Sequence, residues 1–449
     1  MSWKSPPNHS PLLAAVALVT AAILPAPSAR ADAVDPSMPR TLLVGAPRGA
    51  APSERLDAQR SGRSRTLLPS APLHRWEHHL TSGIELSPVV DERGNIFVVG
   101  TTPDVIKLDP EGKELWRVRF GTSAAVVPPV LTSDGTLVVV TASGQAVGVT
   151  PSGTLRFASA LGVRGRDADT PPLALDDGGV IIAAGGVLVE IDRDGVVRAR
   201  TALEIKPGTA DTRVAGALVQ GPITEAGKRS ALFTTESGSV FAWRPPAAPR
   251  KLGNLGGFPR RGAVVTGART LTAVVDSRRI VDFDLPTGVT HVRFNSGAFA
   301  QIDGPVTIAP DGVLLAATLS GLLVGVDAAG NETIRVALEK PPVAPPPLPS
   351  PTAGPPTGVN IFGGQVGGGV GSGFFGVPVE IKPSPPLIID RDGRIAFVRA
   401  AGRAGIITPK GAVVLASERV CSNPIAALPA GEKRLLIACR DGGLWLYGE

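Results

Sequence analysis

The chain has few cysteines, few aromatic residues and no long apolar stretch. Two of its 449 residues are cysteines, one is a tyrosine, and aromatic residues make up 4%. A disulfide-dense scaffold is therefore excluded, and so is a nucleic-acid surface built from basic stripes and stacking rings. The longest apolar run, residues 12–24, is shorter than the ~20 residues that a membrane-spanning helix requires. We therefore expect no transmembrane segment in the mature chain.

Glycine and proline are abundant, with 54 and 44 residues respectively. Both disfavour helix interiors, so a helical bundle is not expected. A hydrophobic content of 43% beside 19% charged residues is sufficient for a sizeable core. The formal net charge of +6 is mild, and we expect no nucleic-acid partner.

The N-terminus has the three parts of an export signal. Lys4 precedes the apolar run 12–24, and Ala29-Arg30-Ala31 matches an A-x-A cleavage site. The sequence thus predicts a signal peptide at 1–31 and an exported protein, periplasmic or extracellular. The first cysteine of the chain is Cys421, so we expect no lipid anchor through an N-terminal cysteine.

A turn followed by a short β-rich run recurs along the chain. The repeated unit is an acidic or polar turn with glycine before four or five apolar residues, as at 91–94, 133–135, 177–178, 311–312 and 392–393. Degenerate copies occur near 229, 269 and 433, and a second glycine turn follows most runs, as at 109–112 and 150–153. A period of about 41 residues with four strands per unit is typical of a β-propeller.

The fold class predicted is therefore all-β, a propeller of eight four-stranded blades, with seven still possible. The last unit lacks an outer strand, and residues 73–80 before the first unit resemble one, so we expect this segment to close the ring. Residues 71–449 form the propeller domain, with a Pro/Gly-rich insertion at about 340–384. Residues 32–70, rich in Arg, Ala, Ser and Pro, are expected to be a flexible leader.

Residues 109–116, Asp-Pro-Glu-Gly-Lys-Glu-Leu-Trp, resemble the repeat of quinoprotein-type (PQQ-like) β-propellers. That superfamily includes quinone-dependent dehydrogenases and the propeller lipoprotein of the outer-membrane barrel-assembly machinery. The strict motif occurs once, so the resemblance is to a diverged repeat, and it implies fold and not function. A quinone-dependent enzyme would imply adjacent cysteines and a calcium site. Neither is matched here, and we predict no cofactor.

Other chemical motifs have structural interpretations. Cys421 and Cys439 flank a turn, which leaves a disulfide or two buried free thiols open. His74, His78 and His79 lie on a predicted strand that places only the first two on one face, so no metal is predicted. A Gly-x-Gly-x-x-Gly string at 371–376 has no helix after it, and the Asp-x-Asp-Gly turns at 192–195 and 390–393 lack the later ligand of a calcium loop.

Connections between blades and between second and third strands share one face of a propeller. These connections are the longer and more basic ones, so this face is the predicted partner surface. Its candidate binding residues are Arg164, Arg166, Arg213, Arg260, Arg261, Phe362, Phe374 and Phe375.

The sequence favours a non-catalytic, exported, monomeric scaffold that binds a protein partner of the cell envelope. The alternative is a secreted propeller enzyme, a quinone-dependent oxidoreductase, lyase or hydrolase, with its site at the central channel. We can assign no catalytic residue and no metal ligand for it.

Overall fold

A computed structural model describes residues 49–449, except 169, 204–212, 222–229, 260–261, 298–300, 339–384, 400–401, 418 and 422. The predicted signal peptide, the first part of the leader and most of the Pro/Gly-rich insertion lie outside the described residues.

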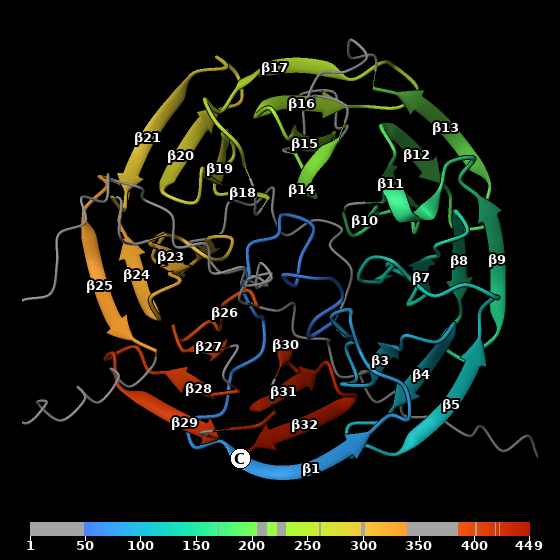
Figure 1. Ribbon diagram of the computed structural model, residues 1–449, viewed down its shortest axis with the longest axis horizontal. Coiled ribbons are helices and arrows are strands. Elements are labelled where there is room, and N and C mark those ends of the chain that lie inside the picture. The colour runs from blue at the N-terminus through green and yellow to red at the C-terminus, as the bar shows by residue number, and fades with distance from the viewer. Residues whose placement is uncertain are drawn as a thin grey trace, which may run out of the picture. The chain divides into compact units, whose positions relative to one another are not determined.

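The described residues form eight antiparallel four-stranded sheets, arranged as blades around a ring (Figure 1). Blades 1 to 4 consist of β2 (Val89–Val90), β3 (Ile96–Val99), β4 (Asp104–Leu108) and β5 (Glu114–Arg119); β6 (Val130–Leu131), β7 (Leu137–Val140), β8 (Gln145–Val149) and β9 (Leu155–Ala160); β10 (Leu173–Ala174), β11 (Val180–Ala184), β12 (Val187–Ile191) and β13 (Val197–Ala202); β14 (Val214–Gln220), β15 (Ala231–Thr235), β16 (Ser239–Trp243) and β17 (Arg250–Asn254). The connection into blade 3 contains one 3₁₀ turn, Gly165–Asp167.

Blades 5 to 8 repeat the pattern, and the last one takes its outer strand from the N-terminal side. They consist of β18 (Ala263–Val265), β19 (Thr270–Val275), β20 (Arg279–Asp284) and β21 (Thr290–Asn295); β22 (Thr307–Ile308), β23 (Leu314–Ala317), β24 (Leu322–Val326) and β25 (Glu332–Ala337); β26 (Ile388–Ile389), β27 (Ile395–Val398), β28 (Ala404–Ile407) and β29 (Val413–Ser417); β30 (Pro424–Pro429), β31 (Arg434–Cys439), β32 (Gly443–Gly448) and β1 (Leu73–His79).

The all-β propeller prediction is confirmed, with eight blades rather than seven. β1 pairs antiparallel with β32, from Leu73 opposite Gly448 to His79 opposite Gly443. The two ends of the propeller thus complete one blade, which closes the ring.

The burial of each strand follows its position in the blade. The inner and middle strands are buried on both faces because neighbouring blades pack against them, as in β3 and β4. The outer strands β5 and β9 alternate between exposed and half-buried side chains. The apolar core therefore lies between blades. Runs of continuous apolar residues form the middle strands, and alternating sequences form the rim.

The acidic turns are held together by their own aspartates. Asp91 accepts hydrogen bonds from the backbone N–H groups of Arg93 and Asn95, at 2.9 and 2.8 Å. Asp192 binds the N–H groups of Asp194 and Val196 in the same way. This side-chain mimicry of a backbone turn explains why the repeat needs Asp there.

Within the described residues, no helix has the length and apolar character needed to cross a membrane.

Candidate functional site

The blade topology gives the ring two chemically different faces. Turns between the first and second and between the third and fourth strands lie on one face, which we call the turn face. Loops between the second and third strands, together with the connections from blade to blade, lie on the other, the loop face. The described loops of the loop face contain both arginines and acidic residues, whereas the turn face contains the turn aspartates.

The structure places two of the predicted binding residues on the loop face. Arg164, before blade 3, and Arg213, before blade 4, are both exposed. The structure describes no ion pair of either side chain. The side chain of Arg166 and the whole of Arg260, Arg261, Phe362, Phe374 and Phe375 lie outside the described residues, so these six predictions stay untested.

A pocket of about 330 Å³ opens on the loop face at blade 5. It is lined by Asp276, Arg278, Arg279, Asn295 and Gly297. The Asp276 carboxylate accepts hydrogen bonds from the Arg279 guanidinium at 2.6 Å and from the Phe258 backbone N–H at 3.0 Å.

These bonds fix the connection out of blade 4 against the loop of blade 5. The ring of Phe258 is left 55% exposed, and Arg278, two residues after Asp276, is also exposed. In the sequence, Phe258 is a lone aromatic residue in a connection rich in Gly, Pro and Arg. It is not among the predicted binding residues.

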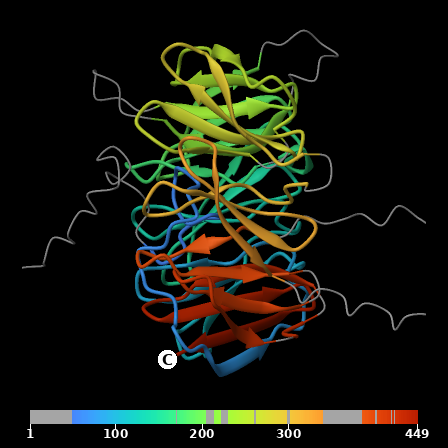
Figure 2. The same cartoon turned by 90° about the vertical axis from the view of Figure 1, so that its left-hand side faces the viewer.

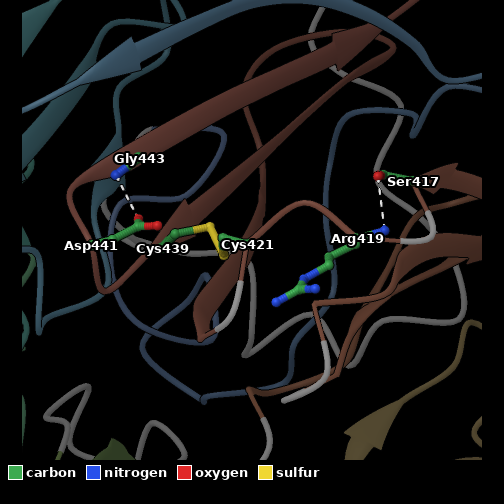
Figure 3. The surroundings of a disulfide bond; sticks show 6 residues. All are labelled: Ser417, Arg419, Cys421, Cys439, Asp441 and Gly443. Carbon is green, nitrogen blue, oxygen red and sulfur yellow. Dashed lines mark hydrogen bonds between the residues drawn. A yellow bond between two sulfur atoms is a disulfide. The ribbon is translucent and has the colours of Figure 1, made fainter.

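Cys421 and Cys439 form a disulfide in the structure, with their Cα atoms 6.3 Å apart. It joins the connection that enters blade 8 to the end of β31 (Figure 3). Beside it, the Gly443 N–H donates to Asp441 Oδ1 at 3.0 Å and the Arg419 N–H donates to Ser417 Oγ at 3.1 Å. The bond lies on the loop face and cross-links two segments of one blade.

The histidines of β1 pack against aromatic rings of β32. His74 lies with its ring 5.6 Å from that of Trp445 and 5.7 Å from that of Tyr447. His79 approaches the other side of the Trp445 ring at 5.9 Å. Among the described residues, no group of three or more His, Cys, Asp or Glu side chains could hold a metal ion. The role of these histidines in the structure is to pack at the ring junction.

Residues 49–68, which we call the strap, run across the centre of the ring and along its turn face (Figures 1 and 2, blue). Ala51 forms an antiparallel bridge with Val90, at the end of the inner strand of blade 1. Further along, Ser64 donates its N–H to the Ile389 carbonyl of blade 7 at 2.7 Å. The described part of the predicted leader therefore closes the turn-face end of the central channel.

The strap buries several charged and polar side chains, among them Arg55 and Arg60. Burial lowers the pKa of Arg55 to about 10 and also lowers the pKa of Arg60. Burial raises the pKa of Asp57, although the Ser61 hydroxyl and backbone N–H both donate to its carboxylate. Glu54 and Asp57 partly offset the loss of hydration of the two guanidinium groups. The channel end is thus filled by a charged segment whose arginines donate to backbone carbonyl groups.

Comparison with known proteins identifies a likeness over part of the chain. The family model of the outer membrane protein assembly factor BamB matches residues 58–253, from the strap into blade 4. No curated protein matches the sequence.

Solved propellers match the fold over most of the chain. BamB from Moraxella catarrhalis is 15% identical with a TM-score of 0.56, over 84% of this chain and 100% of that one. The computationally designed Ika8 protein is 12% identical with a TM-score of 0.57, over 86% and 100%. Virginiamycin B lyase from Staphylococcus aureus is 13% identical with a TM-score of 0.44, over 83% and 98%. At these identities the first two likenesses show the fold alone.

Proposed function

Because the family match and the eight-bladed ring support a diverged member of the PQQ-like propeller family, we propose that this protein is a non-catalytic scaffold. It is exported to the periplasm or the extracellular space, and it binds a protein of the cell envelope through its loop face as a monomer. The known protein named by the family model is an outer membrane protein assembly factor, which gives the proposal its partner class.

The observation that supports the proposal is that the charged side chains of the two faces have different roles. On the turn face, carboxylates such as Asp109 and Asp390 accept hydrogen bonds from their own turns, so they have a structural role. On the loop face, Arg164, Arg213 and Arg278 are exposed, and the structure describes no ion pair for them. Exposed arginines next to an exposed aromatic ring are typical anchors of protein interfaces.

Site-specific crosslinking in the native envelope tests this proposal. A photo-crosslinking amino acid replaces Arg278 on the loop face in one variant and Lys410, an exposed residue of a turn-face loop, in another. We expect envelope proteins to be crosslinked from position 278 and not from position 410, with both variants melting like the wild type. Equal products from the two positions, or none from 278, would contradict the proposal.

Charge reversal measures how much the arginines of the loop face contribute to partner binding. We expect partner capture by the double variant Arg164→Glu, Arg278→Glu to fall at least about tenfold. Charge complementarity between two proteins raises their association rate and fixes the orientation in which they bind. The matched control Lys410→Glu should capture the partner normally. Deletion of residues 341–382 shows separately whether the insertion takes part in recognition.

A further inference from the structure

The strap contacts all eight blades as a bound peptide would. Its carbonyl groups accept hydrogen bonds from backbone N–H groups on six blades: Leu131 to Pro52, Gln220 to Ala58, Val265 to Gln59, Ile308 to Ser61, Ile389 to Gly62 and Lys433 to Leu67. Blade 1 contributes the bridge between Val90 and Ala51, and blade 3 contributes the Pro172 carbonyl, to which Arg60 donates at 3.0 Å. From these contacts we propose that the inner-strand ends on the turn face form a peptide-binding site, occupied in cis by residues 49–68.

Main-chain hydrogen bonds of this kind supply affinity, and side-chain fit supplies selectivity. The N–H groups that bond to the strap come from the last residues of inner strands. These residues are Leu131, Gln220, Val265, Ile308 and Ile389. Each such N–H group would otherwise face the channel without a protein acceptor, which is costly for a buried donor. The ring therefore requires a ligand that presents carbonyl groups to these N–H groups.

Arg60 is the main side-chain anchor of the strap. It is 1% exposed and donates to the carbonyl groups of Glu54 at 2.6 Å, Pro172 at 3.0 Å and Leu218 at 3.4 Å. One guanidinium thus connects the strap to blades 3 and 4. Arg65, in the same segment, is exposed and provides a matched control of equal charge and size.

Gly62 explains why the ligand must have a small residue near the arginine. Its φ is +72°, and a Cβ at this position would lie 2.7 Å from Thr307 Oγ1 and 3.0 Å from the Leu387 carbonyl oxygen. The chemical class of the ligand is thus a peptide with an arginine followed two residues later by glycine, folded into turns like the one that the Gly62 N–H closes on the Arg55 carbonyl. After the strap, Ser70 and Ala71 are exposed, so the covalent connection to β1 can be cut without entering the site.

The experiment uses the full chain with a specific protease site inserted between Ser70 and Ala71. After cleavage we expect the N-terminal fragment to stay bound to the propeller through gel filtration. A labelled synthetic peptide of residues 49–69, in excess, should then exchange into the site. In the cleaved Arg60→Leu variant the fragment should dissociate about 30-fold faster, as expected for a buried arginine anchor, whereas Arg65→Leu should behave like the wild type.

Hydrogen exchange on the uncut chain is the second measurement, in case a cleaved variant fails to stay folded. The amides of Leu131, Gln220, Val265 and Ile308 should lose protection at least about tenfold more in Arg60→Leu than in Arg65→Leu, because opening of the strap exposes them. Amides of the middle strands should change equally in both. Release of the fragment from the cleaved wild type with the propeller still folded would overturn the proposal, as would insertion of the strap into a second copy seen as a dimer in light scattering.

Discussion

A glycine and an aromatic ring form a repeated contact between consecutive blades. Trp76 of β1 packs over Gly112, and Trp116 of β5 packs over Gly153 in the next blade. Each indole also donates to a turn carbonyl of that blade, Pro110 at 3.0 Å and Pro151 at 3.1 Å. The ring covers the turn closely because glycine has no Cβ and adopts a positive φ.

Gly153→Ala tests the energy of this contact. Its φ is +86° and a Cβ would lie 2.9 Å from the Trp116 ring. Gly312→Ala is the matched control, because its φ is +85° and nothing lies within 4 Å of the new Cβ. We expect about 1–2 kcal/mol of destabilisation in Gly312→Ala from backbone strain alone.

In Gly153→Ala a further loss of about 1–3 kcal/mol is expected, because the added methyl group displaces the indole. Urea unfolding followed by tryptophan fluorescence measures both. Equal losses in the two variants would mean that the ring contact contributes nothing beyond the backbone conformation.

At the scale of one blade, the disulfide stabilises the element that closes the ring. Cys421 and Cys439 are separated by 18 residues in the sequence, and cross-linking a loop of about this size stabilises a fold by about 3 kcal/mol. We expect the Cys421→Ser, Cys439→Ser double variant to lose about that amount.

Thermal melting of the double variant, compared with the wild type with and without reductant, checks this value. Reduced wild type should approach the double variant. A melting temperature that is insensitive to both changes would show that the bond adds nothing to blade 8.

The strands could be predicted from the sequence, whereas the strap could not. The outer strand expected at 114–119 is β5, and the closing strand expected at 73–80 is β1 (Leu73–His79). Turn glycines and continuous apolar runs give each blade a local signal. The strap has no such local pattern. Its small residues and arginines bond to backbone groups of distant blades. The composition of this segment predicts a flexible leader. In the structure, however, its Arg60 is only 1% exposed.

For the whole molecule, the two faces can be inferred from the repeat because topology assigns every loop to one of them. The sequence predicts a partner surface only as a region, and this surface stays a prediction. Arg164 and Arg213 are placed on it, whereas Phe258 and the pocket beside it depend on how the connection after β17 packs against Asp276. That packing is a contact between two blades, and a single loop sequence does not specify it.

Carboxylates on the ring make the whole fold sensitive to acid. Partial burial of Asp134 would raise its pKa, but hydrogen bonds from Thr132, Arg156 and Thr136 bring it down from 3.8 to about 2. The Lys433 ammonium and Ser70 lower the pKa of Glu449 to about 2 as well. The pKa values of Glu114 and Glu332 are lowered mainly by side-chain hydrogen bonds from Arg117 and Arg335. A group with a depressed pKa in the folded state stabilises that state above its unfolded pKa and loses this contribution as the pH falls through the folded value.

The melting temperature should therefore fall as the pH is lowered from about 4 to about 2, the interval between the unfolded and folded pKa values of these groups. Asp57 and Glu190, whose pKa values are raised by burial, act in the opposite sense, because they destabilise the folded state as the pH rises above their unfolded pKa values. Asp134→Asn removes one depressed carboxylate, which Arg156 joins to Asp194 of the next blade. Melting curves between pH 2 and pH 6 should thus show a smaller acid loss for Asp134→Asn than for the wild type. An identical slope would mean that the Asp134 pair does not couple protonation to folding.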